Sequence, residues 1–156
     1  YTLSLHDALP ISPLKQIPDE RGRVMHLLRC DDPGFEQFGE IYFSIISPGM
    51  VKAWRMHTKM TMNLAVISGN AKLVLCDARE SSPTKGNIQE VLLGGDNYVR
   101  VKIPPGIYSG FKGMTSSEVI VANCATLPHD PGESIRLDPH SPEIPYIWDA
   151  DPECPE

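Results

Sequence analysis

Short apolar segments separated by turn-forming residues run through the middle of this sequence, and they restrict the fold more than any other feature. Turn signals such as Ser47-Pro48-Gly49, Ser68-Gly69-Asn70 and Gly94-Gly95-Asp96 interrupt the chain at short intervals. Fifteen Pro and twelve Gly in 156 residues supply them. Segments this short leave little room for helices, and no persuasive helical period is present. The pattern therefore predicts an all-β fold, an antiparallel sandwich or barrel.

The expected strands are the segments in which β-branched, aromatic and aliphatic residues gather between these turns. They cover residues 39–46, 51–58, 63–67, 71–76, 88–93, 98–103 and 118–122. Residues 77–86 are expected to form a polar loop, and the Pro- and acid-rich chain from residue 128 an irregular wrap around the barrel. The length accommodates one domain with a real core and is too short for two ordinary domains.

The two ends of the chain are expected to lie outside this domain. Residues 1–12, YTLSLHDALPIS, lack the basic and apolar regions of a signal peptide. They resemble a translated sequencing adapter, so we expect a non-native leader that packs poorly; a native strand is the alternative. The folded domain is then expected over residues 13–149, with a tail over 150–156.

Charge and composition exclude several classes of function. The net charge of −6 argues against a nucleic-acid surface, because phosphate backbones require a concentrated excess of Lys and Arg. A few local cations could still hold one diphosphate. No apolar run approaches the roughly 20 residues that span a bilayer. The four Cys include no CxxC pair, so we expect reduced, mostly buried thiols and a cytoplasmic protein.

Residues 49–69 match the spacing of the first metal-binding motif of the cupins, which are antiparallel jelly-roll barrels. That motif is Gly, five residues, His-x-His, three or four residues, Glu, six residues, Gly. Here Gly49 and Gly69 stand at its ends and His57 at the second His, but Arg55 replaces the first His and Met62 the Glu. Arginine donates hydrogen bonds and does not ligate metals.

The second cupin motif centres on Pro-x-Gly-x-x-His, and residues 104–109 match it except that Ser109 replaces the His. Three of the four ligand positions have therefore lost the imidazole or carboxylate groups that a divalent metal requires. We expect a cupin jelly-roll without a metal or other cofactor. A metal-dependent cupin, such as a dioxygenase, is the least favoured alternative.

Several segments resemble the dTDP-4-dehydrorhamnose 3,5-epimerase family, whose members are metal-free cupins. They are DERG at 19–22, the D-x-R-x-x-S-P-T loop at 77–84, IPPG with a following Gly-Phe at 103–111, IRLDP at 135–139, and residues 143–148. The resemblance covers roughly residues 17–149. It implies an isomerase acting on a nucleotide-linked 4-keto-6-deoxy sugar.

The family's reaction removes a proton next to a ketone and returns one to the opposite face, which requires a base, an electrophile and an acid. The resemblance places His57 at the base and suggests Asp138 as the carboxylate that orients it. Met62 stands where the family has its Lys, and Ala122 where an ungapped alignment has its Tyr. By itself His57 would be read as an ordinary, partly buried histidine, and Asp138-Pro139 as a turn.

Other residues are candidates for substrate binding or for the missing roles. Residues two apart on a strand share a face, so Arg55, His57 and Lys59 are expected to point together, with Lys59 replacing the lost positive charge. Tyr108 is a candidate acid, and Ser109 and Arg55 candidate substrate contacts; Lys59 could equally be solvated and Tyr108 a packing residue. Arg79 is expected to pair with Asp77 in a structural role.

Arg21 matches a family arginine that reaches the nucleotide diphosphate, often across a dimer interface, although it could equally be a turn residue. The resemblance thus implies a homodimer with exchanged N-terminal strands. The leading hypothesis is an epimerase of nucleotide-linked sugars. The alternative is a non-catalytic sugar-nucleotide-binding cupin that has lost the catalytic Lys and Tyr. Solvent-proton exchange into the sugar distinguishes them.

Overall fold

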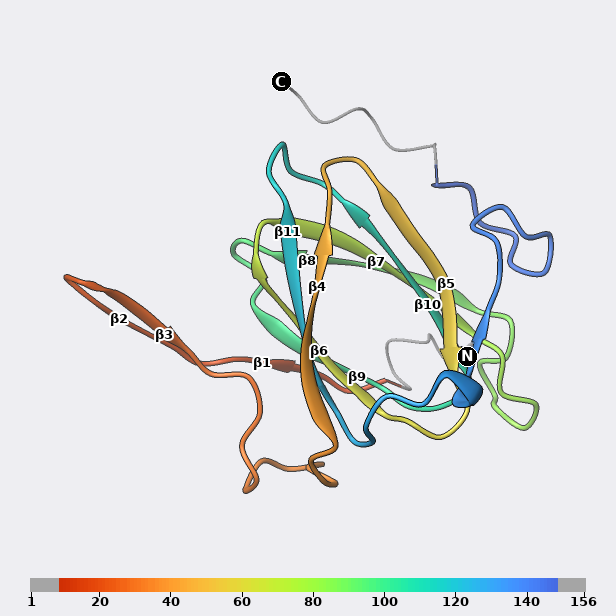
Figure 1. Ribbon diagram of the computed structural model, residues 1–156, viewed down its shortest axis with the longest axis horizontal. Coiled ribbons are helices and arrows are strands. Elements are labelled where there is room, and N and C mark those ends of the chain that lie inside the picture. Colours follow the sequence, from red (N-terminus) through yellow and green to blue (C-terminus); the bar gives the residue numbers. More distant parts are fainter. Residues whose placement is uncertain (1–8, 149–156) are drawn as a thin grey trace.

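The computed structural model describes residues 9–148, and they form an antiparallel β-barrel of two facing sheets (Figure 1). In spatial order, the first sheet contains β1 (Ile11–Pro13), β9 (Val99–Ile103), β6 (Met62–Ser68), β11 (Val119–Ala125) and β4 (Glu40–Ile46). The second contains β12 (Ser134–Arg136), β5 (Val51–His57), β10 (Ile107–Gly113), β7 (Asn70–Asp77) and β8 (Ile88–Gly94). The predicted all-β cupin jelly-roll is confirmed.

A two-stranded hairpin, which we call the arm, projects away from the barrel (Figure 1). It consists of β2 (Gln16–Asp19) and β3 (Gly22–Met25). A single 3₁₀ turn, η1 (Pro131–Glu133), precedes β12. Within residues 9–148, no helix is long and apolar enough to cross a membrane.

All seven predicted strands are present, and their ends differ by up to three residues. The sequence does not predict β10, which lies at the centre of the second sheet, because Gly110 and Gly113 interrupt its apolar pattern. Gly110 is required by close packing: a Cβ there would lie 2.7 Å from both the Ala53 Cβ and a ring carbon of Trp148. The short strands β1, β2, β3 and β12 also lack a recognisable pattern.

The expectation that residues 1–12 pack poorly is wrong for residues 9–12. Leu9 is only 2% exposed and belongs to the main core, and Ile11 and Ser12 pair with Val101 and Arg100 of β9. The backbone N–H of Lys102 also donates to the carbonyl of Pro10. Residues 1–8, the tail at 150–156 and residue 149 lie outside the described residues.

Two apolar clusters stabilise the barrel, one between the two sheets and one on the outer face of the second sheet. The inner cluster lies between the sheets and includes Leu73 and Leu75 of β7, which alternate with outward-facing Val74. The outer cluster covers the second sheet, where the chain after β12 packs on it. Trp54 and Trp148 lie there with ring centroids 5.0 Å apart. The C-terminal wrap that the sequence predicts is therefore part of the core.

The D-x-R-x-x-S-P-T segment forms a hydrogen-bonded loop around the buried carboxylate of Asp77. Both carboxylate oxygens accept from the Arg79 side chain, at 2.9 and 2.8 Å, and the hydroxyls of Ser82 and Thr84 donate to one of them. Burial acts to raise the pKa of Asp77, but these hydrogen bonds outweigh it and hold the pKa well below its usual range. The predicted structural pairing of Arg79 with Asp77 is confirmed.

Replacement of Trp148 by Ala should remove a main support of the outer cluster. The side chain is 1% exposed, and truncation of a buried Trp costs about 3–5 kcal/mol. We expect Trp148→Ala to lower the free energy of unfolding by that amount in urea titrations. Ile147→Ala is the matched control, because Ile147 is 73% exposed. Equal stability of the two variants would show that the C-terminal segment does not support the barrel.

Candidate active site

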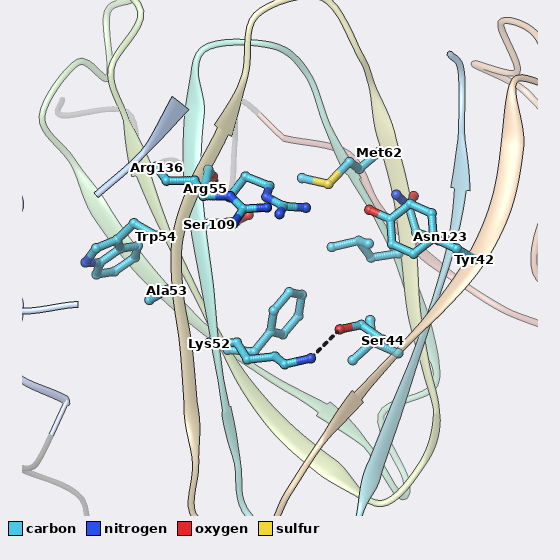
Figure 2. A pocket seen from close by; sticks show the side chains of 13 residues that line it. Tyr42, Ser44, Lys52, Ala53, Trp54, Arg55, Met62, Ser109, Asn123 and Arg136 are labelled. Atoms are coloured by element: carbon cyan, nitrogen blue, oxygen red, sulfur yellow. Dashed lines mark hydrogen bonds between the residues drawn. The ribbon is translucent and has the colours of Figure 1, made fainter. Parts of the chain in front are cut away.

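A cavity of about 390 Å³ lies between the two sheets, and each sheet supplies one wall (Figure 2). The first wall consists of Tyr42 and Ser44 of β4, Met62 and Leu64 of β6, and Val121 and Asn123 of β11. The second wall consists of Lys52 to Arg55 of β5, Ser109 and Phe111 of β10, and Arg136 of β12. Mixed apolar and polar lining of this kind is typical of a small-molecule site.

The cavity is positively charged, although the whole chain is negative. Lys52, Arg55 and Arg136 line it, and no Asp or Glu does so among the described residues. The Lys52 ammonium donates to the Ser44 hydroxyl at 3.2 Å across the cavity (Figure 2). No described residue accepts a hydrogen bond from the Arg55 guanidinium, which extends into the cavity. These cations suit an anionic ligand.

A bulge in β5 places Lys52 and Arg55 on the same wall. Arg55 pairs with Ser109 of β10 and Lys52 with Phe111, so two residues of β5 lie opposite the single residue Gly110. Such a bulge shifts the alternation of side chains by one position. Trp54 consequently points away from the cavity into the outer cluster (Figure 2). Strict alternation from His57 would place Lys52 outside, which is why sequence reasoning missed it.

His57 lies at the end of β5, one inward-facing position beyond Arg55. The pairing of β5 with β12 is continuous from Arg55 to His57, so both side chains face the barrel interior. The ring is 5% exposed, and His57 is not among the residues that line the cavity. Its Nδ1 contacts the Glu133 carboxylate, while its buried Nε2 has no hydrogen-bond partner among the described residues.

Glu133 fixes the protonation pattern of this histidine. One carboxylate oxygen contacts His57 Nδ1, and the other accepts from the backbone N–H groups of Thr58, Lys59 and Met60 at 3.0–3.2 Å. Burial acts to raise the pKa of Glu133, but these hydrogen bonds outweigh it and lower the pKa. An ionised carboxylate only accepts, so Nδ1 carries a proton and neutral His57 has its lone pair on Nε2.

The carboxylate that orients His57 therefore belongs to Glu133, which corrects the prediction of Asp138. Asp138 is exposed, and its side chain accepts from the backbone N–H of His140 at 2.8 Å. Sequence reasoning missed Glu133 because no motif or local pattern marks it, whereas the resemblance drew attention to the segment that contains Asp138. Asp138 belongs to a turn, in which its carbonyl accepts from the backbone N–H of Ser141 at 2.9 Å, and a turn was its alternative interpretation.

The other predicted site residues divide into two groups. Arg55 and Ser109 line the cavity as expected, and the Ser109 hydroxyl donates to the Arg55 carbonyl at 3.4 Å. Lys59 is exposed beyond the end of β5, and Tyr108 lies in the outer cluster opposite Met56. Neither lines the cavity, because β5 ends at His57 and Tyr108 alternates with inward-facing Ser109.

Arg21 lies at the tip of the arm, where its side chain is 84% exposed and pairs with Asp19 at 2.8 Å. The arm projects away from the barrel of its own chain (Figure 1). Arg21 is not among the residues that line the cavity of its own chain.

Met62 and Ala122, which stand where the family has its Lys and its Tyr, lie on opposite faces of the first sheet. Met62 lines the cavity, whereas Ala122 faces the outside of the first sheet, beside exposed Phe43. Its neighbour Asn123 faces inward and pairs with Tyr42 across the strands. Sequence reasoning did not select Tyr42 or Asn123, because the apolar alternation of Ile41, Phe43 and Ile45 would place those residues inside and Tyr42 outside, whereas the structure exposes them.

Among the described residues, no group of three or more His, Cys, Asp or Glu is placed to hold a metal ion. The described cysteines are free: Cys76 is buried, Cys124 is partly buried and Cys30 is exposed. Cys30 thus differs from the expectation of mostly buried thiols.

A model of the dTDP-4-dehydrorhamnose 3,5-epimerase family matches residues 2–155. The chain belongs to this family. Its relatives include a spore coat polysaccharide biosynthesis protein of Bacillus subtilis, which is 30% identical over 92% of this chain and 90% of that protein. A solved dTDP sugar isomerase of Desulfovibrio desulfuricans is 46% identical, with a TM-score of 0.90 over 94% of each chain.

A more distant solved relative shows the same fold. The 3,5-epimerase of Legionella pneumophila, solved with dTDP-4-keto-L-rhamnose, is 24% identical, with a TM-score of 0.81 over 96% of this chain and 82% of that one. Family membership confirms the resemblance seen in the sequence and makes this chain an enzyme of the sugar-nucleotide epimerase class.

Replacement of Glu133 by Gln should destabilise the protein in a pH-dependent manner. A carboxyl group whose pKa is lowered by folding stabilises the fold above its unfolded pKa, near 4.5. That contribution is lost as the pH falls through the folded pKa. We expect Glu133→Gln to cost about 1–3 kcal/mol at pH 7 and progressively less below pH about 4.5, measured by urea unfolding.

Glu118→Gln is the matched control, because Glu118 is exposed. Its unfolding curve should follow that of the wild type at each pH. A Glu133→Gln penalty that stays constant to low pH would contradict an ionised Glu133.

Proposed function

We propose that the protein removes the proton next to the ketone of a nucleotide-linked 4-keto-6-deoxy sugar, with His57 Nε2 as the base. The observation that carries the proposal is the buried His57–Glu133 pair, in which His57 lies two strand positions from the cavity-lining Arg55. Glu133 holds Nδ1 protonated and thereby leaves Nε2 free to accept a proton. Once protonated, the imidazolium would be stabilised by the adjacent carboxylate.

The positive charge of the second wall supports a diphosphate-linked substrate. Arginine binds phosphate oxygens in a bidentate manner, and both Arg55 and Arg136 line the cavity with Lys52. A volume of about 390 Å³ accommodates a sugar ring with part of its diphosphate and leaves the nucleoside nearer the mouth. The solved Legionella relative in complex with dTDP-4-keto-L-rhamnose is consistent with this substrate class.

A homodimer forms part of the proposal, because the arm projects from its own barrel (Figure 1) and leaves apolar side chains exposed. Ile17 and Val24 of the arm are 44% and 59% exposed. On the outer face of β4, at the edge of the first sheet, Ile41 and Phe43 are 50% and 56% exposed. A second copy could cover both surfaces and bring Arg21 to the neighbouring cavity. We place the protein in the cytoplasm, where thiols remain reduced.

The alternative function is binding of a sugar nucleotide without catalysis. The presence of Met62 in place of the family Lys favours it, since a thioether cannot stabilise an enolate by charge. Arg55 lies in the same cavity and supplies a cation, which favours the enzyme.

Exchange of solvent deuterium into dTDP-4-keto-6-deoxyglucose tests the proposal. We expect the wild type to incorporate deuterium next to the ketone and His57→Asn to slow incorporation by about 10²–10⁴-fold, measured by NMR or mass spectrometry. His140→Asn is the control, because His140 is exposed and outside the cavity lining. Tight binding of dTDP-sugar without any exchange by the wild type would favour the binding function.

A mixture of two inactive variants tests the exchange of the arm between subunits. If Arg21 serves the cavity of its partner, Arg21→Ala and His57→Asn are each impaired, but every mixed dimer has one intact site. Equal mixing after subunit exchange should then restore about one quarter of the wild-type rate. If native mass spectrometry shows mixed dimers but the mixture is no more active than either variant alone, Arg21 does not act in the cavity of the partner subunit.

A further inference from the structure

Inversion at a carbon atom requires a proton donor on the face opposite the base. The two walls of the cavity indicate which side chains can be that donor. This inference rests on the proposed function. His57 belongs to β5 in the second sheet. A sugar held between the sheets presents one face to each wall, so the donor must come from the first wall, which β4, β6 and β11 form.

Among the described residues of that wall, Tyr42 is the one with a titratable side chain. The others are Ser44, Met62, Leu64, Val121 and Asn123. A serine hydroxyl is too weak an acid for this role, and an amide does not release a proton under these conditions. A phenol has an ordinary pKa near 10 and acts as a general acid in enzymes.

The position of Tyr42 suits a proton donor. Its hydroxyl points into the cavity toward the second wall, from which Arg55 extends (Figure 2). No described residue forms a hydrogen bond with this hydroxyl, so its proton is available to a ligand. Tyr42 pairs directly with Asn123 of β11, and directly paired residues have Cβ atoms about 4.5–5.5 Å apart.

The other polar side chains of the cavity cannot donate a proton from the face opposite His57. Lys52, Arg55 and Ser109 all belong to the second wall, on the same side as His57. Arginine also retains its proton under all physiological conditions. Asn123 is oriented by its Oδ1, which accepts from the backbone N–H of Asn63 at 3.0 Å. Its role is therefore limited to hydrogen bonding.

We propose that Tyr42 is the general acid that delivers the new proton from the face opposite His57. His57 Nε2 takes the proton of the C–H bond, the electron pair of that bond forms the enolate C=C, and the carbonyl π pair moves to oxygen. The enolate then re-forms the carbonyl as its carbon takes the proton of the Tyr42 hydroxyl. The tyrosinate regains a proton from water, and the imidazolium releases its proton to water, so the cycle is balanced.

Tyr42→Phe separates proton removal from inversion. In D₂O we expect the variant to incorporate deuterium next to the ketone at a rate within about threefold of the wild type, because His57 can exchange its proton and return deuterium to the same face. We expect formation of the inverted sugar to slow by at least about 100-fold. NMR of the recovered sugar reports both the deuterium content and the configuration.

Tyr98→Phe is the matched control, because its hydroxyl lies outside the cavity, where it donates to the His26 carbonyl. Thermal unfolding of both variants monitors the fold. Deuterium incorporation with retained configuration in Tyr42→Phe supports the assignment. Inversion by Tyr42→Phe at the wild-type rate overturns it and leaves the proposed function intact. Absence of deuterium incorporation by the wild type overturns the proposed function itself, and this inference with it.

Discussion

The contact between Glu133 and the end of β5 is the interaction on which the site depends. A single carboxylate binds the His57 ring and three successive backbone N–H groups, so it both orients the imidazole and holds the chain that leaves the strand. Because Glu133 also begins the pairing of β12 with β5, the same contact anchors the edge of the second sheet. These hydrogen bonds stabilise the charged carboxylate in spite of its burial.

A second constraint, the bulge of β5 opposite Gly110, determines which side chains reach the cavity. It turns Trp54 outward, where Trp148 of the C-terminal segment packs against it, and turns Lys52 inward. The absence of a Cβ at Gly110 allows both the bulge and the tryptophan contact. Stability of the outer cluster and charge in the cavity therefore have a common structural origin.

The sequence predicts the fold well and the site only in part, for physical reasons. Turn signals and β-branched runs are local, so they locate seven strands, and the spacing around His57, Arg55 and Ser109 follows from the motif. Glu133 reaches His57 through a contact between residues 76 positions apart, and Lys52 faces the cavity because of a bulge. Neither feature leaves a local pattern in the sequence. Lys59 does not line the cavity because β5 ends at His57, and Tyr108 packs in the outer cluster, so both residues match their alternative interpretations.

The absence of the family Tyr from β11 does not by itself argue against catalysis in this barrel. The proposed reaction requires a phenol inside the cavity and not on a given strand, and directly paired positions of neighbouring antiparallel strands have Cβ atoms only about 4.5–5.5 Å apart. Ala122, at the family Tyr position, pairs with outward-facing Phe43, whereas its inward-facing neighbour Asn123 pairs with Tyr42 on the wall that faces the second sheet. A tyrosine on β4 could thus replace one on β11 without a change of fold. The opposing placement of base and acid would then be maintained by the two sheets, whichever strand of the first wall supplies the acid.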